Sequence, residues 1–216
     1  MPIVSCVSSF SLTSFQRINL AFEQAYETVN MLYKHYSFLQ SPLMKGQFQS
    51  LYNTCAEYAI HDMVAHGRFP AQVKAMIKSN TAKNHNYLKL ETSGCALTFN
   101  SCNSLKPENL PRPSIFRQQQ SFENQSSFFE NWDKHSMVTS YGIILHKKNG
   151  YNGSAYPTVA LGIPDSEYRK WLDYRTLHQI LSSTPQIEVV KEDNEYLDYL
   201  RREISKKAEA DIESLG

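Results

Sequence analysis

Residues 86–101 read NYLKLETSGCALTFNS, and this stretch decides the fold class. Leu88 and Leu90 alternate with polar or amphipathic neighbours, which is the period of a half-buried strand. A second apolar run, CALTFN, follows after Ser93 and Gly94. A two-residue turn that contains glycine, placed between two such runs, is typical of a β-hairpin. Further along, MVTSYGIILHKK (137–148) and PTVALGIP (157–164) flank a turn-rich connection and predict a second hairpin.

Two helices are predicted ahead of the first hairpin, because apolar residues recur there every three or four positions. The first helix begins near Thr13, which forms a capping-box pattern with Gln16. Its apolar stripe consists of Phe15, Ile18, Phe22, Ala25, Val29, Leu32 and Tyr36. The second helix covers 47–66, and its stripe consists of Phe48, Leu51, Cys55, Tyr58, Ala59 and Met63. A short joint connects the two, so they are predicted to form a helical hairpin.

The remaining segments complete the prediction of an α+β fold. SIFRQQQ (114–120) is predicted as a short strand, FENQSSFFENW (122–132) as a helical turn and QIEVV (186–190) as a strand. SEYRKWLDYRTLHQILSS (166–183) is predicted as a helix capped by Asp165. Because helices and antiparallel strands are segregated along the chain, we expect an N-terminal helical hairpin and later helices packed on a mostly antiparallel sheet.

The domain organisation follows from the last segment. We expect 1–192 to form a single α+β domain and 193–216 to form a charged C-terminal helix. Its apolar stripe is narrow and consists of Leu197, Leu200, Ile204, Ala208 and Ile212. We therefore expect this helix to contribute less to the core than the first two, and to be available for docking on a partner or on a second copy of the chain.

Composition narrows the class of protein. The formal net charge of the 216 residues is +1, so any binding of nucleic acid must be local rather than carried by a general basic excess. No stretch approaches the ~18 apolar residues of a membrane span, and the first fifteen residues lack the pattern of a secretory signal. The four cysteines, Cys6, Cys55, Cys95 and Cys102, show no metal-binding spacing. We expect a cytoplasmic protein with four reduced thiols and no membrane partner.

Three patterns are weighed as reactive sites. Glu57 and His61 lie one helical turn apart and could hold a metal ion, but a solvent-facing pair is the simpler interpretation. Asp165 and Lys170 have the wrong spacing for a divalent-metal nuclease. His146 ends a strand, and a solvated strand end is favoured over a catalytic role. No metal or cofactor site is predicted.

The segment 109–132, NLPRPSIFRQQQSFENQSSFFENW, is the candidate ligand site. Arg112 and Arg117 could recognise phosphate or carboxylate, and Asn124 and Gln125 could read polar edges. Its aromatic residues are costly to expose, so we expect Phe116, Phe122, Phe128, Phe129 and Trp132 to anchor the segment. The polar side chains would then face a groove. The alternative is a crossover connection whose polar residues only cap backbone groups.

The order of five short motifs, NYLKLE, PRPSIFR, FENQSSFF, TSYGIIL and VALGIPD with a tryptophan soon after, resembles a group of uncharacterised bacterial proteins. Those proteins are encoded beside helix-turn-helix regulators fused to an ImmA/IrrE-type metallopeptidase, in mobile elements and toxin–antitoxin-like operons. The resemblance covers about 84–171. It implies a cytoplasmic protein of phage defence or stress response with a cognate regulator as partner. The positions that carry over are Tyr87, Arg112, Phe116, Arg117, Asn124, Gln125, Gly142 and Trp171.

These observations lead to three functional hypotheses. The first is a toxin-like or phage-defence effector, held in check by a cognate regulator or antitoxin, that binds a nucleotide or nucleic acid at Tyr87, Arg112, Arg117, Asn124 and Gln125. The second is a non-enzymatic module that binds the regulator. The third is a divergent metal-dependent nuclease, which requires carboxylates that converge in space.

Overall fold

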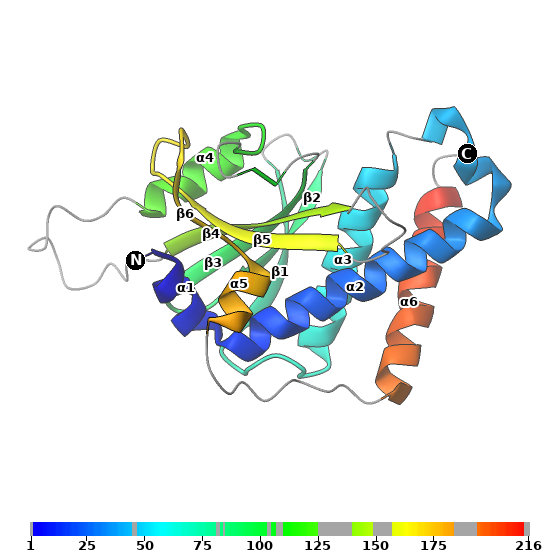
Figure 1. The fold of residues 1–216 in the computed structure, drawn as a ribbon, viewed down its shortest axis with the longest axis horizontal. Helices are drawn as coiled ribbons and strands as arrows, with labels where there is room; N and C mark the ends of the chain where they lie inside the picture. Colours follow the sequence, from blue (N-terminus) through cyan, green and yellow to red (C-terminus); the bar gives the residue numbers. More distant parts are fainter. Residues whose placement is uncertain are drawn as a thin grey trace, which may run out of the picture.

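The computed structural model describes residues 2–44, 47–80, 83, 85–102, 105–106, 110–124, 140–148, 157–183 and 194–213. Its centre is a six-stranded sheet in the order β1-β2-β3-β4-β5-β6 (Figure 1). The strands are β1 (Lys74–Ser79), β2 (Asn86–Glu91), β3 (Cys95–Ser101), β4 (Ser140–Lys148), β5 (Pro157–Pro164) and β6 (Trp171–Thr176). All neighbours are antiparallel except β3 and β4, which are parallel. The predicted α+β class and mostly antiparallel sheet are confirmed.

Helices cover the two faces of the sheet unequally (Figure 1). One face packs against α1 (Pro2–Phe10), α2 (Leu12–His35), α3 (Phe48–Ala65) and α5 (Leu177–Ser182), and α6 (Asn194–Glu213) packs behind α2 and α3. Leu90, Leu97 and Ile144 of the sheet belong to this large core. The other face carries α4 (Ile115–Ser121) over a small cluster around Ala96, Tyr141 and Tyr168. Short 3-10 helices follow α2 as η1 (Ser37–Gln40) and η2 (Pro42–Met44), and follow α4 as η3 (Phe122–Asn124).

Several predicted elements change type or position. SIFRQQQ is the helix α4 rather than a strand. The predicted helix at 166–183 is instead a turn, then β6, then the short α5, because β6 pairs with β5 at the sheet edge. The cap of α2 is Ser11 rather than Thr13, and α1 was not predicted. QIEVV and residues 125–132 lie outside the described residues.

The C-terminal helix belongs to the main core. Leu200, Ile204 and Ala208 are fully buried against α2 and α3. The hydroxyls of Tyr196 and Tyr199 also donate to the carboxylate of Asp62 on α3, over 3.1 and 3.3 Å. The apolar stripe that we expected to be available for a partner is therefore covered within the chain.

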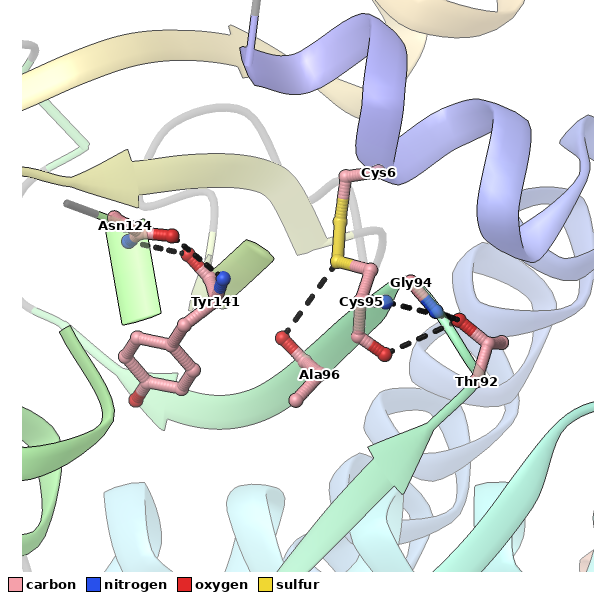
Figure 2. Close-up of a disulfide and its surroundings, with 7 residues drawn as sticks. All are labelled: Cys6, Thr92, Gly94, Cys95, Ala96, Asn124 and Tyr141. Atoms are coloured by element: carbon pink, nitrogen blue, oxygen red, sulfur yellow. Dashed lines mark hydrogen bonds between the residues drawn. A yellow bond between two sulfur atoms is a disulfide. The ribbon is translucent and has the colours of Figure 1, made fainter. Parts of the chain in front are cut away.

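A disulfide ties the first helix to the sheet. Cys6 of α1 is bonded to Cys95 at the start of β3, with their Cα atoms 5.5 Å apart (Figure 2). α1 also passes close to the β2–β3 turn, where a Cβ on Gly94 would lie 2.7 Å from the Ser9 hydroxyl. The prediction of four reduced thiols is wrong for this pair, because the two residues meet only after α1 docks on the sheet. Cys55 and Cys102 are not part of a disulfide.

None of the helices in the described ranges combines the length and the apolar character that crossing a membrane requires.

Candidate functional site

The sheet opens between β2 and β3. Their pairing covers only 89–91 with 96–98, whereas 86–88 pair with β1 alone and 99–101 with β4 alone. A carboxylate from the helical layer fills the gap in the hydrogen-bond ladder: Glu57 of α3 accepts the Leu88 N–H through Oε2 over 3.0 Å. A backbone donor without a strand partner needs such an acceptor when it is buried. Glu57 thus lies at the edge of the opening.

A buried polar chain leads from Glu57 into the core. The Asn53 amide donates to Glu57 Oε1 over 2.7 Å, and its oxygen lies 2.9 Å from His146 Nε2. Because the amide oxygen can only accept, Nε2 carries the proton. His146 Nδ1 then accepts from the Tyr26 hydroxyl at 2.8 Å. His146 is fully buried, so the expectation of a solvated strand end is wrong.

Burial moves the two titrating groups of this chain in opposite directions. It raises the pKa of Glu57 to about 7, although the hydrogen bonds from Leu88 and Asn53 and the charge of Arg117 oppose the rise. It lowers the pKa of His146 to about 3. In both cases the low-dielectric surroundings disfavour the charged form. His146 is therefore neutral at pH 7, and Glu57 keeps its proton to pH values well above the usual range of a carboxyl.

On the opposite face of the sheet, α4 turns several polar side chains inward, while an apolar side chain near each of its ends is exposed. Ser121 is fully buried, and buried polar atoms also occur on Ser114 and Gln120. In contrast, Ile115 is 63% exposed and Phe122, just after the helix, is 60% exposed. The expectation that Phe122 anchors the segment is therefore wrong. Surface helices normally bury their apolar stripe, so this orientation calls for a separate explanation.

Arg117 is the central residue of the inner side of α4. Its guanidinium donates to Asn100 Oδ1 on β3 and to the Arg112 carbonyl over 3.2 Å. It lies 5.0 Å from the ring centroid of Phe116, which stacks on Tyr87 of β2 at 4.3 Å. Among the described side chains no carboxylate forms an ion pair with it, and its buried Nε has no hydrogen-bond partner. The cation is thus positioned by neutral oxygens and rings.

Tyrosine hydroxyls lie on the same face as Arg117. The Tyr141 hydroxyl is 2.7 Å from Thr98 Oγ1 and is buried. Tyr168 is 7% exposed, and its hydroxyl has no partner. Its backbone adopts a φ of 56°, and the turn is held by the Asp165 carboxylate, which accepts the Arg169 N–H at 2.6 Å. The role of Asp165 is therefore to hold this turn.

The structure brings some of the predicted site residues together and not others. Tyr87 and Arg117 meet through Phe116, whereas the Arg112 side chain is exposed. Asn124 clamps backbone: its amide donates to the carbonyls of Tyr141 and Pro164 at 2.8 Å each and accepts the Tyr141 N–H at 2.6 Å (Figure 2 shows the Tyr141 contacts). Gln125 lies outside the described residues. A ligand at these positions remains a prediction.

Neither metal hypothesis gains support from the described part of the chain. In those residues no three His, Cys, Asp or Glu side chains gather as a metal site would require. Glu57 is half-buried and bonded to Asn53 and Leu88, so it does not form a solvent-facing pair with His61.

Comparison with known proteins gives no relative: no family model, no curated protein and no solved structure matches this chain.

Proposed function

We propose that this protein is an effector that binds a phosphate-bearing ligand, a nucleotide or a nucleic acid, at Arg117 between α4 and the β2–β3 opening. The supporting observation is the state of Arg117. It is positioned without an ion-pair partner among the described residues, and one buried N–H is unused. A guanidinium recognises phosphate through paired N–H groups. The attraction between its charge and the phosphate is strongest where water is partly excluded.

The aromatic residues beside Arg117 extend the proposed recognition. Tyr87 and Phe116 form a stacked pair next to the guanidinium. Planar rings of this kind can support a base by stacking with little dependence on its identity. The net charge of +1 fits recognition of one or a few phosphates rather than of a long duplex.

Control by a partner protein is the second part of the proposal, and the outer side of α4 favours it. Ile115 and Phe122 are both more than half exposed, and Gln118 and Gln119 lie beside them on the surface. Exposed apolar residues near a polar rim are common at protein interfaces. A cognate regulator that covers this side would also cover the ligand site beneath α4.

The ligand site is tested with three variants. Arg117→Ala removes the charge, Arg117→Lys keeps the charge but loses the paired donors, and Arg202→Ala removes an exposed charge on α6 as the control. Binding of nucleoside mono- and triphosphates and of short single-stranded RNA and DNA is measured by calorimetry. We expect both Arg117 variants to weaken binding by about tenfold or more and Arg202→Ala to leave it unchanged. Equal binding by all four proteins, or no binding by the wild type, would refute the proposal.

The effector role is tested in bacteria by inducible expression with and without the gene that neighbours this one. We expect growth arrest by the wild type alone, no arrest by Arg117→Ala, and relief by the neighbouring product. Phe122→Ser should arrest growth without relief by the neighbouring product, because it alters only an exposed side chain that follows α4. Relief of Phe122→Ser equal to that of the wild type would place the partner elsewhere.

A further inference from the structure

We propose that the Tyr168 hydroxyl and Arg117 Nε form a buried pair of donors that binds the oxygen atoms of the ligand's anionic group beneath α4. This inference rests on the proposed ligand site at Arg117 and adds the depth at which the anion is held. It also assigns Tyr168, in the β5–β6 turn, to ligand binding.

The distribution of unsatisfied polar atoms motivates the proposal. In the described residues, eight buried side-chain atoms have no hydrogen-bond partner. Five of them lie at α4 or on the sheet face that α4 covers, on Ser114, Arg117, Gln120, Tyr168 and Tyr174. Native proteins leave few buried polar atoms unpaired, and each costs free energy in the folded state. Their concentration on this face of the sheet indicates a partner that is not part of the chain.

Packing explains the ring of Tyr168 but not its hydroxyl. The ring belongs to the small apolar cluster with Ala96, Tyr141, Ile143 and Leu145. Phenylalanine would fill the same space without burying an unpaired oxygen. The position is also demanding for the backbone, because φ is 56° and a bulky residue rarely adopts it. The hydroxyl is the part of this side chain that packing leaves unexplained, so it calls for a partner outside the chain.

Arg117 and Tyr168 lie on the same face of the sheet, and α4 links the two. The charge of Arg117 acts to lower the pKa of the Tyr168 phenol, against a larger rise from burial that brings it to about 12. Ser121 at the end of α4 donates to the Ser166 carbonyl of the β5–β6 turn over 3.1 Å. The helix that carries Arg117 is thus fixed to the turn that carries Tyr168.

The chemistry of the two groups selects the class of ligand. The phenol stays protonated at neutral pH and the guanidinium stays charged, so both can donate. Two unused donors beside a positive charge fit a group with several acceptor oxygens and negative charge, which is a phosphate or a carboxylate. Tyr141 does not qualify, because its hydroxyl already pairs with Thr98.

The test compares two substitutions that each remove one hydroxyl. Tyr168→Phe should keep or raise the melting temperature, because the lost oxygen has no internal partner. Tyr141→Phe should lower it, because Thr98 Oγ1 would lose its buried partner. Affinities for inorganic phosphate, acetate and a nucleoside monophosphate are measured on both variants, the wild type and Arg117→Ala. We expect Tyr168→Phe to weaken binding of the anion by about tenfold.

The outcomes separate the two proposals. If Arg117→Ala loses binding while Tyr168→Phe binds like the wild type, the anion is held by Arg117 alone, and this inference is wrong although the proposed function stands. If Tyr168→Phe melts well below the wild type, its hydroxyl has an internal partner and the inference is also wrong. If the wild type binds none of the probes, both proposals fail. Weaker binding of the monophosphate by Tyr168→Phe, with no binding of inorganic phosphate or acetate by the wild type, would support the inference and assign the site to nucleotides.

Discussion

Glu57 and His146 are joined by one amide, that of Asn53, yet they affect stability with opposite signs. The pKa of Glu57 is raised from 4.5 to about 7, so between these values the folded chain holds a proton that the unfolded chain has lost. Stability therefore falls as pH rises through this window. The pKa of His146 is lowered from 6.5 to about 3. Its contribution to the stability of the folded state therefore rises as the pH increases from 3 to 6.5. The two contributions oppose each other from about pH 4.5 to 6.5, so the stability of the wild type should change little with pH in that window.

Glu57→Gln should expose this compensation. Without the titrating carboxyl, the opposing contribution of His146 is no longer balanced. Relative to the variant, the wild type should lose up to about 1.4 kcal/mol of unfolding free energy per pH unit from pH 4.5 to 7. Urea unfolding of both proteins at pH 5, 6 and 7 measures the difference. Parallel pH profiles would mean that Glu57 titrates normally in the folded state.

Some of the residues predicted for the ligand site lie together, whereas others hold the backbone. Arg117 was predicted from its residue type and Tyr87 from the family resemblance, and the stack through Phe116 places the two together. Asn124 was also predicted from its residue type, but its amide holds β4 and the end of β5. Residue type indicates which bonds a side chain can make, whereas the fold decides which partners are in reach. Tyr168 was not singled out, since an isolated tyrosine carries no pattern.

At the scale of elements, the residue pattern predicted the helix α6 but not the helix α4. The stripe of α6 repeats every three or four residues over 20 residues and was predicted as a helix. α4 has seven residues, too few to show a period, and its buried side is polar. Periodicity methods assume that the apolar side faces the core. A short helix with the reverse orientation is therefore predicted incorrectly.

The burial of α6 carries a prediction about stability. Leu200 of α6 is fully buried where α6 packs on α2 and α3, whereas Arg202 on the same helix is exposed. Leu200→Ala should destabilise the protein by about 2–5 kcal/mol, because it removes buried methyl groups and leaves a cavity. Arg202→Ala, the matched control, should change the free energy of unfolding by less than about 0.5 kcal/mol. Thermal or urea unfolding measures both, and a small effect of Leu200→Ala would show that α6 is peripheral.

For the whole molecule, the Cys6–Cys95 bond is the longest covalent constraint that the described residues show. It spans 89 residues and fixes α1 to the centre of the sheet. A cross-link over a loop of this length lowers the conformational entropy of the unfolded chain. In the chain-entropy description, this raises the free energy of the unfolded state by roughly 4–5 kcal/mol at 25 °C. Reduction should therefore lower the urea midpoint of the wild type substantially. Cys6→Ser should unfold at the lower midpoint with or without dithiothreitol. A wild-type midpoint that is insensitive to reductant would mean that the thiols are not joined in solution.

The sequence by itself determined the α+β class, the helical hairpin, both strand pairs and the charged terminal helix. These features depend on periods of two or of three to four residues, which neighbouring residues along the chain encode. Only the tertiary structure decided that β6 replaces a predicted helix, that α4 faces its polar side inward, and that Cys6 meets Cys95. It also decided that Glu57 fills the gap in the sheet at Leu88, 31 residues away, and that Asn53 bonds His146, 93 residues away. The physical reason is that such contacts are made between distant segments, so their partners are set by docking and burial rather than by local pattern.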